Sequence, residues 1–293
     1  MTMREAVERF TRDGISIAMS CCLEPLIPFA AGHELIRQGR RDLELIGPIS
    51  DSLFDQLIGA GCVRRLTAAW VGNVSEGLGH CYRRAVESGE PRPIEVHDHS
   101  NFSVALGLWA GAWGSPWIDT VTLLGSDIVH SNPNLEVVDG YVRVPALKPE
   151  VCILHVQRAD AAGRAHAWGP LGIAEEAALA AKAVIVQCEE LVDEEVTLSD
   201  PNRVLVPETK VVAVVHEPGG AHPAPVQGHW KRDHGFMRDY AQRSRTAEGF
   251  RSWLEEWVLN LPDRAAYLGR LGDLERLRIH GRRESAPVNY ADE

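Results

Sequence analysis

Residues that could do chemistry lie in several short polar loops between apolar segments. In loop 72–77 (GNVSEG), Glu76 is the most tempting carboxylate nucleophile, because Ser75 and Gly77 place it on a turn beside small residues. An acidic residue just before a helix also stabilises the helix N-terminus, which is the alternative interpretation.

A second loop combines glycine with hydroxyl and carboxyl groups. Gly125, Ser126 and Asp127 follow the predicted strand 120–124. A glycine there lets backbone N–H groups approach a ligand, while Ser126 and Asp127 offer a hydroxyl and a helix cap. The same residues also suit a plain turn with an N-cap.

His97 and His99 lie two positions apart, so on a strand they could share a metal ion. Nothing in the sequence singles out a third ligand, and we predict no metal site. Ser100 or Asn101 is instead a suitable N-cap for the helix expected from Phe102 onward. At 219–223 (GGAHP), a structural turn and a ligand-contacting loop both remain open.

Nucleotide, dinucleotide, lipase and zinc-protease signatures are missing from the sequence: GxxxxGK[ST], GxGxxG after a strand, GxSxG and HExxH do not occur. A net charge of -11 argues against a nucleic-acid binder. None of the six cysteines forms a CxxC pair, and no apolar run is long enough to span a bilayer. We therefore expect a cytoplasmic protein with neither a nucleic-acid nor a membrane partner.

The elements that must position these loops alternate between strand and helix patterns. Strands are expected at 15–19, 43–46, 66–70, 120–124, 151–156, 184–188 and 211–215, and helices at 4–10, 29–38, 51–58, 78–87, 102–113 and 173–183. Continuously apolar strands alternating with helices predict an α/β fold with an open, mostly parallel sheet and helices on both faces. Ligands of such sheets bind beyond the carboxyl ends of the strands.

We expect residues 1–293 to form a single domain. The apolar stripe of Phe250, Trp253, Leu254, Trp257 and Val258 predicts C-terminal helices over about 248–275 that pack on its body. The tail 282–293 is expected to be flexible.

Several motifs, in their order along the chain, give the sequence a family resemblance. They are residues 33–39 (HELIRQG), 54–61 (FDQLIGAG), 125–127 (GSD), 155–160 (HVQRAD), 168–169 (WG), 188–190 (CEE) and 219–223 (GGAHP). The sequence resembles the α (A) subunits of class I CoA-transferases, which act on substrates such as glutaconate and 3-oxoadipate, over nearly its whole length.

The resemblance implies a CoA-transferase that moves CoA between an acyl-CoA and a (di)carboxylate. A glutamate on the partner β subunit would form a glutamyl-CoA intermediate, so this chain should supply no catalytic residue of its own. The CoA thioester would be a substrate, with no tightly bound cofactor. The partner β subunit would complete the site in an αβ or α2β2 assembly.

The resemblance also assigns site residues. A Gly-Gly-Phe-type oxyanion loop is expected after strand 15–19, but Ser20, Cys21 and Cys22 stand there. The backbone N–H groups of this loop could still donate to an oxyanion. Side chains in place of glycine would crowd the acyl group, so we expect the enzyme to accept a narrower range of acyl substrates. We prefer this interpretation to a cysteine nucleophile, because no adjacent base is identifiable. The remaining expected substrate or CoA contacts are Asn73, Ser75, Ser100, Asn101, Gly125, Ser126 and Asp127.

Two rival functions remain. A related two-subunit enzyme of steroid-ring degradation uses this fold to hydrolyse a CoA thioester. Its acidic catalytic position aligns with the neutral Asn101, with Asp98 and Glu95 just upstream. The third candidate is a non-catalytic protein that binds acyl-CoA as part of the same assembly.

Overall fold

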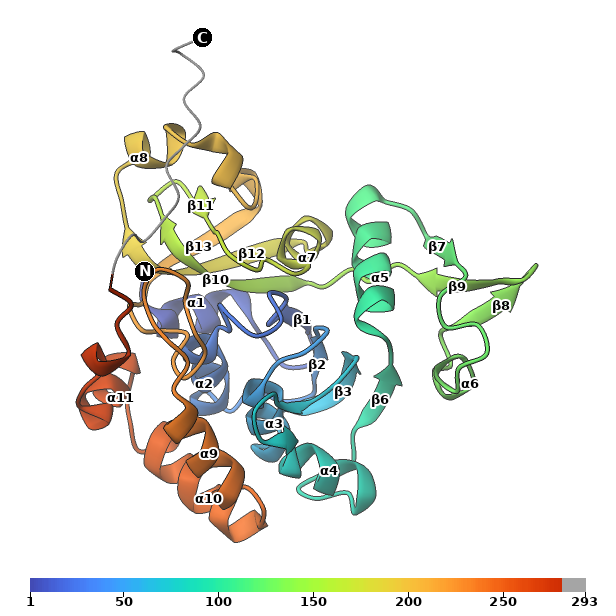
Figure 1. Ribbon diagram of the computed structural model, residues 1–293, viewed down its shortest axis with the longest axis horizontal. Helices are drawn as coiled ribbons and strands as arrows, with labels where there is room; N and C mark the ends of the chain where they lie inside the picture. The colour runs from blue at the N-terminus through green and yellow to red at the C-terminus, as the bar shows by residue number, and fades with distance from the viewer. Residues whose placement is uncertain (281–293) are drawn as a thin grey trace.

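A parallel sheet runs through the centre of the molecule (Figure 1), which is a computed structural model describing residues 1–280. Within these residues the main sheet has eight strands. In spatial order they are β13 (Val211–His216), β12 (Ala183–Leu191), β10 (Val151–Ala159), β1 (Ser16–Met19), β2 (Leu43–Ile46), β3 (Val63–Ala68) and β6 (Glu95–Asp98), with β11 (Ala165–His166) beside β10.

Every neighbouring pair along this order is parallel, and only β11 runs antiparallel to its neighbour. The predicted open, mostly parallel α/β sheet is thus confirmed. The strand order reverses at the pair β1 and β10, because β2, β3 and β6 extend to one side and β12 and β13 to the other. Such a reversal opens a crevice at the carboxyl ends of the strands, where open α/β sheets bind ligands.

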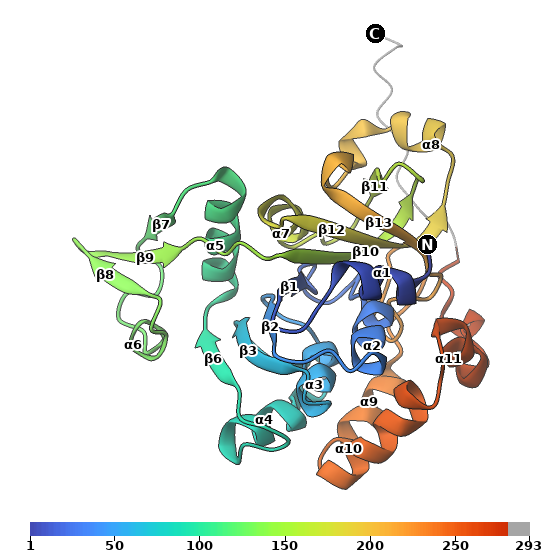
Figure 2. The same cartoon turned by 180° about the vertical axis from the view of Figure 1, so that it is seen from behind.

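Helices cover both faces of the sheet (Figures 1 and 2). One face carries α1 (Met3–Phe10), α2 (Phe29–Arg37), α3 (Ser52–Gly59), α4 (His80–Glu87), α9 (His234–Arg243), α10 (Ala247–Leu254) and α11 (Arg264–Leu271), and the other carries α5 (Asn101–Trp113) and α7 (Ala174–Ala180). Short elements fill the connections: α8 (Glu194–Leu198), η1 (Pro201–Arg203), η2 (Glu208–Lys210), the π-helical turn η3 (Glu255–Leu259) and η4 (Glu275–Leu277).

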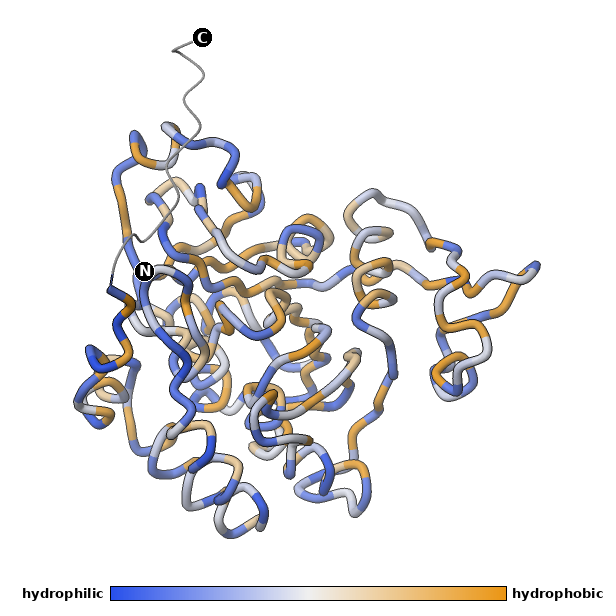
Figure 3. The backbone as a smooth tube through the Cα atoms, viewed as in Figure 1, coloured by the Kyte–Doolittle hydropathy of each residue, from blue (hydrophilic) through white to orange (hydrophobic). Residues whose placement is uncertain are grey.

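The two faces have separate apolar cores because successive strand residues point to opposite sides. On β1, Ile17 and Met19 pack into the core beneath α1, α2 and α3, whereas Ala18 packs into the core beneath α5 and α7. Figure 3 shows the hydrophobic residues concentrated along the central strands. Both faces of the sheet that carries the strand-end loops are therefore covered by packed helices.

A small lobe stands apart from the main sheet (Figures 1 and 2). It holds an antiparallel sheet of β7 (Trp117–Thr120), β9 (Tyr141–Pro145) and β8 (Glu136–Val138), together with α6 (Ile128–Ser131). The strand predicted at 120–124 is wrong. The Thr120 hydroxyl accepts a hydrogen bond from the Thr122 N–H at 3.1 Å and Leu123 has φ 74°, so the chain turns there.

The helix that leads into this lobe exposes aromatic surface. Trp109 and Trp113 on α5 stack with ring centroids 5.7 Å apart and planes 9° from parallel. The Trp109 indole N–H donates to Glu176 on α7 at 2.7 Å, and Trp113 is 73% exposed.

The C-terminal helices lie against the face that carries α2 and α3. Trp253 and Tyr267 are fully buried and belong to the same apolar core as Ile17. The helix α9 was not among the predicted elements. That residues 1–293 form a single domain stays a prediction, and the predicted flexible tail at 282–293 lies outside the described residues.

Among residues 1–280, no helix combines the length and the apolar character that crossing a membrane requires.

Candidate active site

Four loops form a row along one edge of the main sheet. They follow the carboxyl ends of β1, β2, β3 and β6, which are parallel neighbours. With a strand spacing of about 4.8 Å, the row extends roughly 14 Å from the first loop to the last. Three of these loops hold residues that the sequence predicted; the loop after β2 was missed.

The loop after β1 lies where the strand order reverses. Ser20 has φ 61° and is buried, and its Oγ has no hydrogen-bond partner among the described residues. The Cys21 carbonyl accepts from the Ile173 N–H at 2.8 Å. Within residues 1–280, the N–H groups of Cys21 and Cys22 donate no hydrogen bond to another backbone group. The loop therefore holds free N–H donors at the switch point of the sheet.

The two thiols of this loop are poor nucleophiles. Cys21 and Cys22 are buried beside Cys152. Burial raises the pKa of the Cys21 thiol well above its ordinary range and the pKa of Cys22 to about 12. Both side chains are consequently protonated at neutral pH, so the chemistry available here comes from the backbone.

The loop after β3 forms the short hairpin of β4 (Gly72–Asn73) and β5 (Gly77–Leu78). Asn73 is buried: its Nδ2 donates to the Met237 carbonyl at 3.3 Å, and its Oδ1 accepts from the Ser75 N–H at 3.0 Å. Ser75 is exposed, with its Oγ 3.5 Å from Nδ1 of His234. Glu76 is also exposed and pairs with Arg238 at 3.6 Å, as an acidic residue on a solvated turn does.

The end of β6 leads directly into α5. The Ser100 hydroxyl accepts from the Ser103 N–H at 3.1 Å and caps the helix, as predicted, while Asn101 is exposed in its first turn. His97 is paired with Glu95 at 2.7 Å, and His99 with the Ser103 hydroxyl at 2.9 Å. In the described chain, no three His, Cys, Asp or Glu side chains are grouped so that they could hold a metal ion.

Gly125, Ser126 and Asp127 lie on the lobe, next to α6. Gly125 has φ 77°, and the Ser126 hydroxyl donates to the Leu123 carbonyl at 2.8 Å. The lobe meets the main sheet through Asn132, whose Nδ2 donates to the Asp98 carbonyl at the end of β6 at 2.7 Å. The turn is thus associated with β6, three strand positions from β1, and its contact with a substrate stays a prediction.

The loop at 219–223 follows β13. The Gly219 N–H donates to Glu189 at 2.8 Å, and the Arg264 guanidinium donates to the carbonyls of Gly219 and His222 at 2.5 and 2.8 Å. These bonds tie the loop to β12 and α11, which favours the structural interpretation of this turn.

Asp51, in the loop after β2, is the residue of the row that the sequence analysis missed. It stands between β2 and α3 with φ 50° and ψ -134°. This backbone conformation raises the free energy of any residue other than glycine. Its carboxylate is fully buried and pairs with Arg232 at 2.5 Å. Burial raises the pKa of Asp51 to about 6, although Arg232 acts to lower it.

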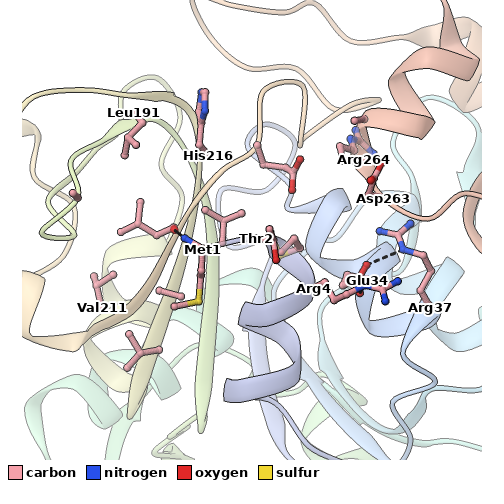
Figure 4. A pocket seen from close by; sticks show the side chains of 18 of the residues that line it. Met1, Thr2, Arg4, Glu34, Arg37, Leu191, Val211, His216, Asp263 and Arg264 are labelled. Carbon is pink, nitrogen blue, oxygen red and sulfur yellow. Dashed lines mark hydrogen bonds and ion pairs between the residues drawn. The ribbon is translucent and has the colours of Figure 1, made fainter.

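A pocket of about 760 Å³ lies elsewhere, beside the edge strand β13 (Figure 4). Charged side chains from three helix segments face β13 across it: Arg4, Glu34, Arg37, Asp263 and Arg264. Arg37 donates to Glu34 at 2.8 Å within this wall. No residue of the four-loop row lines the cavity.

Comparison with known proteins identifies similar chains. Residues 1–217 match the family model described as Coenzyme A transferase. The α (A) subunit of 3-oxoadipate CoA-transferase from Pseudomonas knackmussii is 39% identical over 280 residues, which cover 93% of this chain and 98% of that one.

Similarity extends to a solved structure and to a hydrolase. The α (A) subunit of glutaconate CoA-transferase from Acidaminococcus fermentans is 29% identical over 93% of this chain and 91% of its own length. The crystal structure of that enzyme matches with a TM-score of 0.90, covering 96% of this chain and 95% of the other. The IpdA subunit of the cholesterol ring-cleaving hydrolase from Mycobacterium tuberculosis is 25% identical over 84% of this chain and 89% of its own.

Proposed function

The chain belongs to the coenzyme A transferase family, and from this membership we propose that it is the α (A) subunit of a two-subunit enzyme that moves CoA between an acyl-CoA and a (di)carboxylate. Its partner is a β subunit, in an αβ or α2β2 assembly. The CoA thioester is a substrate, and the assembly works in the cytoplasm, where its six free thiols stay reduced.

The observation that carries this proposal is the loop after β1. It combines free backbone N–H donors with thiols that burial keeps protonated. Such a loop can stabilise an oxyanion but cannot attack a thioester. The carboxylate in the next loop, Asp51, is fully buried and paired with Arg232. Family membership implies that the nucleophilic glutamate lies on the partner, and these groups of the present chain are consistent with that assignment.

In the proposed reaction, a glutamate carboxylate of the partner attacks the thioester carbonyl of the acyl-CoA. The carbonyl oxygen takes the negative charge, and the N–H groups of Cys21 and Cys22 donate to it. Collapse breaks the C–S bond and leaves an acyl-glutamyl anhydride and CoA thiolate. The thiolate attacks the glutamyl carbonyl, which gives the glutamyl-CoA thioester and releases the first carboxylate. A second carboxylate reverses these steps and leaves as the new acyl-CoA.

Trapping the intermediate tests the proposal. The complex of this chain with its partner is incubated with acyl-CoA and then reduced with borohydride or cleaved with hydroxylamine, and the modified residue is mapped by mass spectrometry. The expected adduct is on a glutamate of the partner. Activity of this chain alone would contradict the half-enzyme assignment.

The same experiment separates the two rivals. The first rival is a CoA-thioester hydrolase, which the similarity to the ring-cleaving hydrolase supports. Such an enzyme releases CoA without any carboxylate acceptor and without an adduct. A non-catalytic acyl-CoA-binding subunit gives neither adduct nor turnover. Either result would overturn the transferase assignment.

A further inference from the structure

Helix α5 has an apolar side that the described residues leave uncovered. Between Asn101 and Trp113 the helix carries no charged residue, and a helix that is apolar all round is normally buried all round. Phe102, Trp109 and Trp113 are nevertheless 51%, 36% and 73% exposed. They lie at positions i, i+7 and i+11, so they share one side of the helix. This surface, with the small half-buried residues between the rings, is called the α5 face: Phe102, Ala105, Trp109, Ala112 and Trp113.

The other sides of α5 pack within this chain. Val104 and Leu108 belong to the core that α5 shares with α7, and Leu106 belongs to the small core of the lobe. The α5 face lies between these two contacts. Its central ring is held by the bond from the Trp109 indole N–H to Glu176 of α7. The face is therefore formed before a partner arrives, which reduces the entropic cost of binding.

Exposed aromatic residues of the described chain are confined to this region. All the exposed Phe, Trp and Tyr residues among 1–280 lie on α5 or on the lobe strands β7 and β9, which pack against α5: Phe102, Trp109, Trp113, Trp117 and Tyr141. With about half of each side chain uncovered and roughly 150–250 Å² per aromatic side chain, they expose about 400–600 Å². That is at least half of the roughly 800 Å² that each partner of a stable complex buries. Aromatic enrichment of this kind is typical of protein interfaces.

The position of the α5 face favours one occupant. Because α5 begins at the carboxyl end of β6, the exposed Phe102 follows directly on Ser100 and Asn101 at the end of the four-loop row. In the proposed reaction the partner brings a carboxylate into this row, and a chain that covers the row at Asn101 also reaches Phe102. CoA does not match the face, because its phosphates need charged or N–H donors that apolar side chains do not supply. A second copy of this chain would bring no nucleophile to the row.

We propose that the α5 face is the docking surface for the partner β subunit, with Trp109 and Trp113 as its anchors. The inference rests on the proposed function, which supplies the partner, and goes beyond it by placing the contact on one helix of this chain. The matching surface of the partner is apolar and adjoins the loop that carries its nucleophile.

Substitution in the α5 face tests the inference with the two purified subunits. Trp113→Ala is expected to weaken partner binding by about 30-fold or more, as truncation of an aromatic anchor does, and Phe102→Ala is expected to weaken it as well. Isothermal titration calorimetry measures Kd, and urea denaturation confirms that each variant folds. The matched control is Leu198→Ala on α8, which truncates a similarly exposed apolar side chain and should leave Kd unchanged.

Cross-linking identifies the occupant directly. The complex is assembled with the photoreactive substitution Trp113→p-benzoylphenylalanine, or with the same replacement at Leu198 as a control, and is then irradiated. Mass spectrometry is expected to find position 113 joined to a peptide of the partner subunit and position 198 joined to none.

Each outcome decides between the claims. A folded Trp113→Ala variant that binds the partner with wild-type affinity overturns the inference, and so does a cross-link from position 113 to a second copy of this chain. Both results leave the transferase assignment standing. If Trp113→Ala does not fold, the cross-link decides, and absence of any partner peptide overturns the inference. A wild-type complex that assembles through the α5 face but hydrolyses acyl-CoA without transfer to any carboxylate overturns the proposed function and supports the docking surface.

Discussion

At the scale of single residues, the two thiols of the loop after β1 are buried and protonated. With the pKa of Cys22 near 12, only about one molecule in ten thousand carries the thiolate at pH 8. We predict that iodoacetamide leaves Cys21 and Cys22 unmodified in the folded protein, whereas all six cysteines react in denaturant. Peptide mapping checks this, and rapid labelling of either residue in the native state would restore the cysteine nucleophile as a candidate.

Asp51 makes stability depend on pH in a defined window. Its folded pKa of about 6 exceeds the pKa near 3.9 of an unfolded aspartate, so the folded state holds a proton that the unfolded state has released. This contribution is present below pH 3.9 and is lost as the pH rises to 6.

The matching prediction compares the free energy of unfolding of the wild type with that of Asp51→Asn. From pH 4 to pH 7 the wild-type free energy of unfolding should fall by up to about 3 kcal/mol relative to the variant. Urea denaturation at several pH values measures it. A difference that does not change with pH would show that Asp51 titrates normally.

The candidate site was predictable from sequence where polar residues follow an apolar strand or precede an apolar helix. Ser20 directly follows β1, and Ser100 caps α5. Asp51 looked like an ordinary helix start, because its positive φ and its burial are consequences of tertiary packing. Arg232 lies about 180 residues further along the chain, and no local pattern connects the two.

At the scale of elements, the loop after β1 is held by its packing against Gly172. A Cβ on Gly172 would lie 2.3 Å from the Cys21 carbonyl oxygen, and φ there is +57°. We predict that Gly172→Ala destabilises the protein by about 1–3 kcal/mol and lowers kcat/KM of the complex, because the loop must move.

The control for that variant is Gly269→Ala in α11. No atom lies within 4 Å of its Cβ position, and it is helical, so we expect about 0.5–1 kcal/mol of stabilisation. Urea denaturation compares the two. A Gly172→Ala protein as stable and as active as wild type would mean that this contact does not hold the loop.

Strands and helices with strong periodicity were predicted well. The strand 43–46 has the same bounds in the structure, and the helix predicted at 29–38 is α2 (Phe29–Arg37). The short elements were not: β6 is a polar strand of four residues that pairs only with β3 in the main sheet, and the lobe strands lie in a polar segment. Their conformation is set by pairing with distant strands, which a local pattern does not encode.

At the scale of the whole molecule, buried neutral histidines make the fold sensitive to acid. Burial lowers the pKa of His99 and of His222 to about 4. An unfolded histidine binds its proton near pH 6.5, so the stability that each neutral ring contributes is present above that pH and is lost as the pH falls toward 4.

We therefore predict that the free energy of unfolding falls as the pH decreases from 6.5 to 4.5. His99→Gln should reduce the slope of this fall by the equivalent of about one bound proton. Urea denaturation of both proteins measures the slopes. Parallel slopes would contradict a depressed pKa for His99.

The stacked indoles of Trp109 and Trp113 give this molecule an optical label of its own. Two nearly parallel chromophores at 5.7 Å couple their excited states, and both are exposed, Trp113 more than Trp109. Near-ultraviolet circular dichroism, with Trp113→Phe as the uncoupled reference, reads the conformation of the end of α5 without any added dye. The emission of Trp113 would then report any molecule that binds over the end of α5.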